Sequence, residues 1–194
     1  MIAYVKGGFT YKSPAVVHVD VNGLGYEVHI SLQTFTHIQS LERGLLYTYL
    51  HIREDAQVLY GFFEVAEKEM FTQLIGISGV GAATARMMLS SMRYDEIARA
   101  IMQGNARVLE NIKGIGKKSA ERIILELRDK LIKQPVGSVI SPLANNSLEQ
   151  DALNALISLG IARPVAEQAI KKVMSKEPET DKVEDIIKKA LKTF

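Results

Sequence analysis

The segment LIGISGVGAATA (residues 74–85) recurs 35 positions later as LENIKGIGKKSA (residues 109–120), and this repeat decides the fold around it. A leucine, an isoleucine, two glycines and an alanine are shared, and the register extends to Leu89 and Ile124. Similarity at one fixed spacing predicts an internal duplication. Each copy predicts a helix, a tight Gly-x-Gly turn and a second helix that begins at the turn.

The turns, SGVG at residues 78–81 and KGIG at residues 113–116, have the chemistry of an anion-binding site. Glycine adopts positive φ angles and has no Cβ to hold a ligand away from the main chain. The first amides of the following helix lack intrahelical partners and together carry roughly half a positive charge, so they can bind a phosphate. The alternative is that two helical turns need glycine only for their own geometry.

This arrangement resembles the helix-hairpin-helix motif of DNA-binding proteins, present here in tandem. The resemblance implies that the turns hold backbone phosphates of one duplex and read no base edge. Two copies in one register, with lysines after the second, favour DNA binding over the structural alternative. The residues expected at the DNA backbone are Gly79, Val80, Gly81, Ala83, Thr84, Gly114, Ile115, Gly116, Lys117 and Lys118.

Composition narrows the class of protein. The chain has 194 residues, 47% of them hydrophobic, which is enough for one to three small domains with real cores. It has no long apolar run and no signal pattern at Met1, so we expect a soluble, cytoplasmic protein without membrane contact. It has no cysteine and its 4 histidines lack metal-ligand spacing, so no metal or other cofactor is expected.

The net charge of +2 is too small to indicate nucleic-acid binding by itself, but its distribution is informative. Residues 1–63 have 4 basic and 5 acidic side chains, residues 64–134 have 12 and 9, and residues 135–194 have 8 and 8. The small positive excess lies on the segment with the repeat. DNA binding must therefore depend on main-chain amides, or on several subunits that add their charges.

Residues 1–63 predict a small β-barrel. Apolar residues alternate with polar ones on both sides of Asn22-Gly23, which predicts a hairpin of two strands. Five short strands in about sixty residues suit a closed barrel of the OB type, with a small sandwich as the alternative. The expected strands are 2–6, 17–21, 26–30, 46–52 and 57–62.

Arg53-Glu54-Asp55-Ala56 lies between the last two of these strands. Its paired carboxylates have three interpretations. The first is a solvated turn, where aspartate is common. The second is a metal site of a nuclease, which needs carboxylates from separate elements. The third is that the carboxylates repel phosphate and steer DNA strands. The third interpretation is favoured only if this side of the barrel contacts DNA.

From Glu64 onward the apolar period is helical. Helices are expected at 65–75, 83–92, 94–103, 106–111 and 118–133, followed by a Pro- and Gly-containing linker and by three helices that begin at Ser147, Arg163 and Thr180. We therefore expect a barrel domain (1–63), a helix-hairpin-helix domain (64–134), a flexible linker (135–146) and a three-helix docking domain (147–194).

The whole chain resembles the RuvA family, which binds Holliday junctions in the RuvAB branch-migration complex. The resemblance rests on GLGYEV at 23–28, REDAQ at 53–57, LYGF at 59–62, the two glycine turns, and ALNAL at 152–156 with Leu159-Gly160. It implies a multidomain fold: an N-terminal OB-type β-barrel, a central all-α tandem helix-hairpin-helix domain and a C-terminal three-helix UBA-like module.

The same resemblance implies a function. A homotetramer, single or as two facing tetramers, would hold a four-way junction open and planar and recruit the RuvB hexameric ATPase for branch migration in recombination and repair. The RuvC resolvase is a further implied partner. Glu54 and Asp55 would form an acidic pin at the junction centre. Partner docking would use the C-terminal module, with Leu153, Leu156 and Ile187 as contacts, although their spacing is also that of a core.

The sequence departs from the family pattern after the first turn. Many members have Pro-Lys directly after the second glycine, whereas Gly81 is followed here by Ala82-Ala83-Thr84. The main-chain amides, the Thr84 hydroxyl and Arg86 remain as contacts. We therefore expect the second turn, with Lys117 and Lys118, to contribute more of the salt-dependent affinity.

Two other functions remain as alternatives. A DNA lyase or glycosylase would use a lysine after the turn as a nucleophile, but the sequence shows no matching carboxylate and base pocket. A DNA-independent adaptor would not prefer four-way junctions over linear duplex. The sequence also has no Gly-x4-Gly-Lys-Ser/Thr motif, so we expect a non-catalytic subunit.

Overall fold

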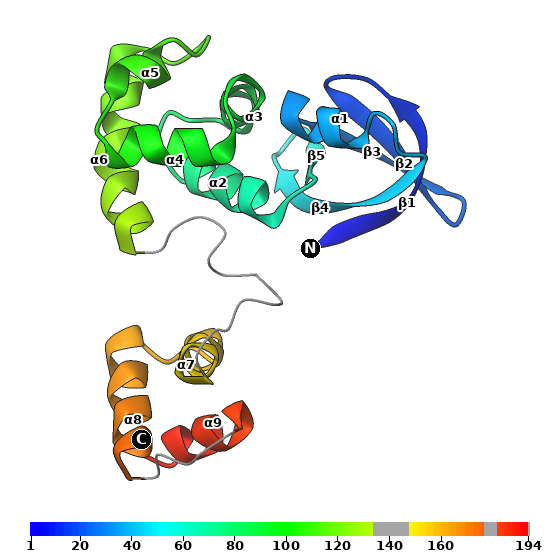
Figure 1. Ribbon diagram of the computed structural model, residues 1–194. Coiled ribbons are helices and arrows are strands. Elements are labelled where there is room, and N and C mark those ends of the chain that lie inside the picture. Colours follow the sequence, from blue (N-terminus) through cyan, green and yellow to red (C-terminus); the bar gives the residue numbers. More distant parts are fainter. Residues whose placement is uncertain (134–147, 177–181, 194) are drawn as a thin grey trace. The chain divides into compact units, whose positions relative to one another are not determined.

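The computed structural model describes residues 1–133, 148–176 and 182–193, which belong to two compact units, Met1–Ser141 and Pro142–Phe194. Figure 1 shows a barrel and a layer of helices in the first unit and further helices in the second. Within the described residues, no helix has the length and apolar character that a bilayer crossing requires.

A closed five-stranded barrel forms the start of the chain, in the order β1-β2-β3-β5-β4 (Figure 1). Neighbouring strands are antiparallel except β3 and β5, which pair in parallel through His29–Tyr60 and Ile30–Gly61. Closure confirms the predicted barrel and excludes the sandwich. The strands are β1 Tyr4–Lys12, β2 Val16–Val21, β3 Leu24–Ile30, β4 Arg43–Ile52 and β5 Gln57–Phe62.

A short helix, α1 (Leu32–Ile38), follows β3 and is not among the elements that the sequence pattern predicts. Ser31 caps it, since its side chain accepts a hydrogen bond from the N–H of Thr34. Seven residues that include two threonines have a weak helical preference, so the pattern alone does not reveal the helix. Packing stabilises it, because Thr34 and Ile38 are buried against the barrel.

The helices of the repeat match the predicted ones to within one residue at each end. They share one core, which includes Phe71, Leu89, Ile101 and Leu127. This core continues into the barrel through Tyr60 and contains buried side chains from each of the helices α2 to α6. The helices are α2 Val65–Ile75, α3 Ala82–Ser91, α4 Tyr94–Met102, α5 Ala106–Glu110 and α6 Lys117–Lys133.

The second unit contains α7 (Leu148–Ser158), α8 (Arg163–Lys176) and α9 (Val183–Leu191), which enclose a small core of their own. Gly160 ends α7 as expected, with a φ of 89° and with Ile161 N–H donating to the Leu156 carbonyl at 3.1 Å. The predicted linker 135–146, the helix start at Ser147 and the helix start at Thr180-Asp181 lie outside the described residues.

Candidate nucleic-acid interface

The two glycine turns have the same internal hydrogen bonds, so the sequence repeat is also a structural repeat. In each turn the residue between the glycines donates its N–H at 3.0 Å to the carbonyl three residues earlier. The following helix begins with a 2.9 Å bond to the carbonyl of the second glycine. The matched pairs are Val80 to Ile77 with Ile115 to Ile112, and Ala85 to Gly81 with Ala120 to Gly116.

The two glycines of each turn serve different purposes. Gly79 and Gly114 have φ angles of 89° and 91°, a region that side chains rarely tolerate, so the backbone itself requires glycine there. Gly81 has a φ of −80°, and a Cβ at Gly81 or Gly116 would meet no atom within 4 Å. No described residue therefore requires glycine at Gly81 or Gly116, and the missing side chain leaves room for a ligand.

Val80 and Ile115, both predicted at the DNA backbone, also anchor their turns, and their contact with DNA stays a prediction. Their side chains are only 5% exposed, and their N–H groups are already donated within the turns. Each therefore fixes its turn to the helical core. The amides without an intrahelical partner are the first ones of the next helix.

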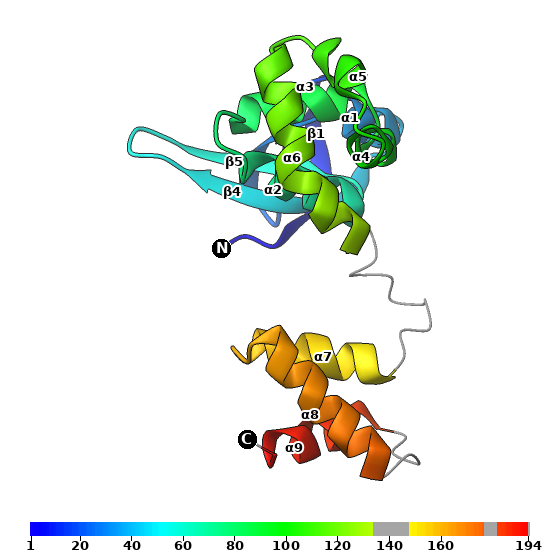
Figure 2. The same cartoon turned by 90° about the vertical axis from the view of Figure 1, so that its left-hand side faces the viewer.

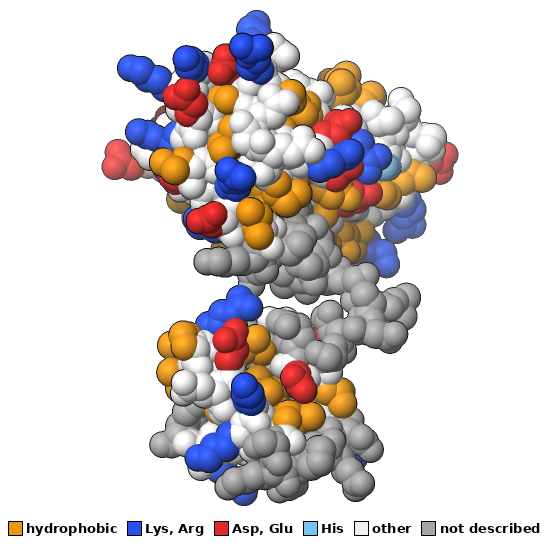
Figure 3. Space-filling model, turned by 60° about the vertical axis from the view of Figure 1, so that its left-hand side comes forward, with side chains coloured by type: hydrophobic (Ala, Val, Ile, Leu, Met, Phe, Trp, Pro, Cys, Tyr) orange, Lys and Arg blue, Asp and Glu red, His pale blue; other side chains and the backbone are white. Residues whose placement is uncertain are grey.

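The helix starts present these amides to solvent together with side chains of the expected kind. On α3, Ala83 is exposed and Thr84 is half-buried. On α6, Lys117 and Lys118 are both exposed and are the first two residues of the helix. Figure 3 shows lysine and arginine side chains along the edge of the first unit, mixed with carboxylates. The second turn and its helix start therefore have three exposed ammonium groups, those of Lys113, Lys117 and Lys118, where the first turn and its helix start have none.

An arginine connects the two turns. Arg122, one turn into α6, donates from Nη1 to the carbonyl of Ser78 at 3.1 Å. Ser78 is the first residue of the first turn, so this bond holds the start of the second hairpin's helix beside the first hairpin. The sequence pattern does not indicate this contact, because the two residues are 44 positions apart.

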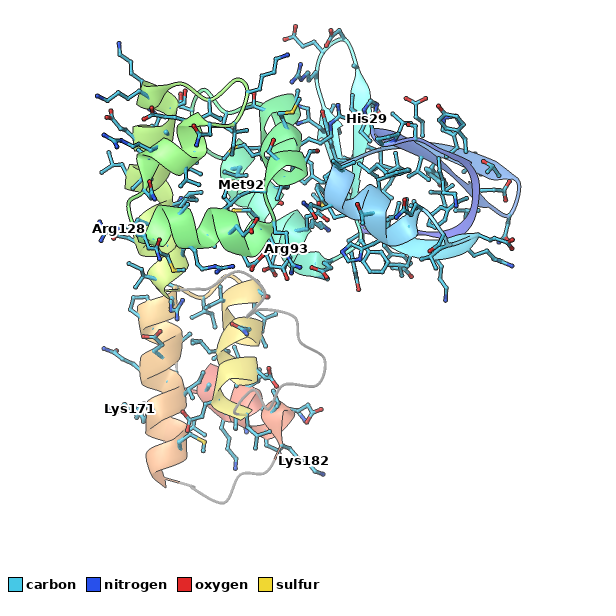
Figure 4. The ribbon with its side chains drawn as sticks, turned by 45° about the horizontal axis from the view of Figure 1, so that its top comes forward. His29, Met92, Arg93, Arg128, Lys171 and Lys182 are labelled. Carbon is cyan, nitrogen blue, oxygen red and sulfur yellow. The ribbon has the colours of Figure 1, made fainter. Side chains whose placement is uncertain are left out.

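Arg86, which was expected to contact DNA, donates to the barrel through Nη1, and its contact with DNA stays a prediction. Its Nη1 lies 3.1 Å from the carbonyl oxygen of Ala15 and 3.1 Å from Nδ1 of His29. Figure 4 labels His29 on the barrel. Arginine is always a donor, so Nδ1 of His29 accepts. Ser90, one turn later on α3, accepts an N–H bond from Leu32. These bonds attach α3 to the barrel.

The barrel and the helices also meet at a buried carboxylate. Glu67 of α2 is 4% exposed and accepts hydrogen bonds from the hydroxyls of Ser31 and Thr34. Burial raises the pKa of Glu67, while the two hydroxyls act in the opposite direction. The sequence contains no signal for this contact, because a glutamate in the first turn of a helix is ordinary.

The acidic pair lies at the end of a hairpin that extends beyond the barrel (Figure 2). Glu54 and Asp55 are exposed in the turn between β4 and β5, which the Arg53 N–H closes with a 2.8 Å bond to the Ala56 carbonyl. Within the described residues, no group of three or more His, Asp or Glu side chains is placed to hold a metal ion. The two carboxylates therefore lie exposed at the end of a projecting hairpin.

In the second unit, the side chains predicted for docking lie in or against its core. Leu153 and Leu156 are 7% and 0% exposed, and Ile187 packs against the same cluster. The side chain of Leu156 is fully buried between the three helices, so it is not exposed to a partner in this fold. Two large apolar side chains are well exposed nearby: Leu159, just after α7, at 64%, and Val165, in the first turn of α8, at 45%.

Comparison with known proteins covers nearly the whole chain. Residues 1–61 match the RuvA N terminal domain, residues 71–129 the SAM-like helix-hairpin-helix tandem, and residues 147–193 the RuvA C-terminal domain. Proteins named Holliday junction branch migration complex subunit RuvA are similar over their full length. The one from Cytophaga hutchinsonii is 43% identical over 99% of both chains, and the one from Flavobacterium psychrophilum is 43% identical over 100% of both. The chain belongs to the RuvA family.

Proposed function

We propose that this chain is the Holliday junction-binding subunit of a branch migration complex, as its relatives are named. The observation that carries the proposal is the matched pair of glycine turns, each with a second glycine whose space the protein does not use. The chain is a non-catalytic subunit. Its role is to bind and shape DNA for a partner that consumes ATP.

Main-chain recognition explains binding without sequence preference. At each turn a phosphate approaches the second glycine and accepts hydrogen bonds from the free amides of the next helix, where the helix dipole favours negative charge. Two turns held together by Arg122 contact two phosphates at a set spacing. The distance between two phosphates is set by the sugar-phosphate backbone and not by the base sequence. The two turns can therefore bind any duplex arm of suitable geometry.

The acidic hairpin determines which DNA shape is favoured. We place four copies of the chain around the crossover, so that Glu54 and Asp55 of each copy face the junction centre. Carboxylates near phosphates repel them, which opposes stacking of the arms and favours an open, planar cross. Whether one tetramer or two facing tetramers bind one junction does not affect this mechanism.

Each segment of the chain has its own role in this proposal. We assign residues 147–194 to docking on the RuvB ATPase, residues 135–146 to the connecting linker, and residues 1–63 and 64–134 to DNA. The family matches at 1–61, 71–129 and 147–193 each lie within one of these segments and support the division. RuvC is a further proposed partner.

Because the DNA that the protein binds is chromosomal, we place the protein in the cytoplasm.

Gel-shift titration of four-way, three-way and linear DNA, with sedimentation of the free protein, tests the proposal. We expect binding to the four-way junction to be at least about tenfold tighter than to linear duplex, and the free chain to be a tetramer. A protein with Glu54→Gln and Asp55→Asn should bind linear duplex more tightly and lose preference for the open junction. Equal affinity for all three DNAs, or a free monomer, would exclude the proposed mechanism.

A further inference from the structure

Two imidazole rings on the outer face of the barrel share one carboxylate. Glu27 of β3 has one carboxylate oxygen 3.4 Å from Nε2 of His29 and the other 3.7 Å from Nε2 of His18. His18 lies opposite Glu27 in the β2–β3 ladder, and His29 follows Glu27 by two residues, so all three side chains are on the same face of the sheet. The side chain of His29 is 31% exposed, so protons from solvent reach its ring.

His29 connects this group to the helix that follows the first glycine turn. Its Nδ1 accepts a hydrogen bond from Nη1 of Arg86 on α3. A neutral imidazole that accepts at Nδ1 has its proton on Nε2, and this nitrogen faces Glu27. The carboxylate therefore favours the ring tautomer in which His29 holds Arg86.

The groups around His29 act on its charge in opposite directions. Glu27 favours the protonated ring, whereas the guanidinium of Arg86 opposes it. The ring of Tyr60 on β5 has its centre 5.9 Å from that of His29. Among the described residues, the groups that face His29 or its direct partners are Glu27 on β3, His18 on β2, Tyr60 on β5, His51 on β4 behind Tyr60, Arg86 on α3 and the carbonyl of Ala15.

A second proton on the ring of His29 removes the acceptor for Arg86. Nδ1 then has a hydrogen that is directed at Nη1 of Arg86, 3.1 Å away, and two positive groups face each other. Nε2 of the charged ring keeps Glu27 as its partner, whereas Nη1 of Arg86 keeps the Ala15 carbonyl alone. Imidazole side chains ordinarily take up this proton between about pH 8 and pH 5.

We propose that His29 is a positioning residue for Arg86, which it holds to the barrel while its ring is neutral and releases when the ring is protonated. The inference rests on the proposed function and concerns its first glycine turn. A helical side chain covers the turn before its own Cα, so a released Arg86 reaches the surface around Ala83, three residues earlier on the same side of α3. Ala83 is exposed, and the second copy of the repeat has Lys118 at this position. Protonation of His29 therefore gives the first turn a positive charge for a DNA phosphate.

The first experiment measures the Arg86–His29 bond without DNA. A double-mutant cycle of His29→Phe and Arg86→Gln, followed by urea unfolding, gives the coupling between the two side chains. At about pH 8 we expect a coupling of about tenfold in the unfolding equilibrium constant, as for one hydrogen bond to a charged group, and at about pH 5.5 less than about twofold. Other groups that titrate, such as Glu67, cancel in the cycle. His37→Phe with Arg86→Gln is the control cycle, because the exposed ring of His37 stacks on Phe63 and should show no coupling.

The second experiment measures the affinity for a four-way junction at the same two pH values. For the wild type we expect affinity to rise about tenfold at the lower pH, and the slope of log affinity against log salt to steepen by roughly 0.9, for one more neutralised phosphate. His29→Gln keeps an oxygen that accepts from Arg86 at either pH and should lose this rise. Arg86→Gln should lose it too, although its His29 still becomes charged. His37→Gln should keep the rise.

The outcomes separate this inference from the proposed function. If the Arg86–His29 coupling is the same at both pH values, or if Arg86→Gln keeps the full rise in affinity, His29 does not control Arg86 and the inference is wrong. If the wild type shows no preference for four-way over linear DNA, the proposed function fails. In that case, a coupling that is lost at the lower pH would still establish the proton-dependent hold on Arg86. Thermal unfolding of each variant at both pH values checks that the fold is intact.

Discussion

The hydroxyl of Thr34 donates a 2.7 Å hydrogen bond to Oε2 of Glu67 and so joins the barrel to the helical layer. Both hydroxyls that contact this carboxylate already accept a main-chain N–H: Ser31 from Thr34 and Thr34 from Phe63, each at 3.0 Å. Their hydrogens are therefore available to Glu67. The contact sets the position of α2, and with it the first glycine turn, relative to the acidic hairpin.

Removal of this carboxylate should destabilise the first unit. Glu67→Ala leaves two buried hydroxyls without an acceptor, at a cost of about 1–3 kcal/mol for each. Glu67→Gln keeps one acceptor oxygen and should cost less than Glu67→Ala. Urea unfolding followed by circular dichroism gives both values. Glu126→Gln, on the exposed side of α6, is the control, and a similar destabilisation there would contradict the assignment.

The same carboxylate should give stability an unusual pH dependence. Burial raises the pKa of Glu67 in the folded chain above the ordinary value of 4.5 that applies when the chain is unfolded. Between these two values the folded state binds more protons than the unfolded state, so the stability that this group contributes falls as pH rises. The free energy of unfolding of wild type relative to Glu67→Gln should therefore decrease above pH 4.5. A difference that grows with pH would show the opposite shift.

The two glycines of the first turn should respond differently to alanine. Gly81→Ala should leave the free energy of unfolding unchanged to about 0.5 kcal/mol, because its φ is −80° and the Cβ meets nothing. It should nevertheless weaken junction binding, because the methyl group occupies the space of a phosphate. Gly79→Ala should cost about 1–2 kcal/mol of stability at a φ of 89°. Unfolding and gel-shift measurements on the same samples distinguish these effects, and unchanged DNA affinity for Gly81→Ala would rule out close phosphate approach there.

Salt dependence should identify the lysines of the second turn. The double variant Lys117→Ala and Lys118→Ala should reduce the slope of log affinity against log salt by roughly 0.9 for each phosphate that a lysine no longer neutralises. Lys130→Ala, at an exposed position three turns further along α6, should leave the slope unchanged. An unaltered slope in the double variant would mean that the main chain alone binds the phosphates at this turn.

Docking on the motor should depend on exposed apolar side chains of the second unit. Leu159→Ser with Val165→Ser should weaken binding of the RuvB ATPase and leave the module folded, because both side chains are exposed. Leu156→Ser should unfold the module instead, at a cost of about 2–5 kcal/mol, because its side chain is fully buried. Pull-down and thermal melting separate the two effects. If the double variant of Leu159 and Val165 binds the ATPase as well as the wild type does, these two side chains are not part of the docking surface.

The amino-acid sequence by itself determined the features that depend on local geometry. Three features could be predicted from the sequence because they depend on periodicity and turn chemistry within short segments. They are the 35-residue repeat, the strand alternation around Asn22-Gly23 and the acidic turn at Glu54-Asp55. The positive φ of Gly79 and Gly114 follows in the same way. Relatives of known name then agree with the family that these motifs indicated.

Only the tertiary structure decided which distant residues meet. The contacts of Arg122 with Ser78 and of Arg86 with His29 depend on how the chain is packed, because they span 44 and 57 positions. Packing also decided that Leu156 lies in a core. An apolar period marks the buried side of a helix, but it does not state which surface covers that side, because burial depends on elements far along the chain.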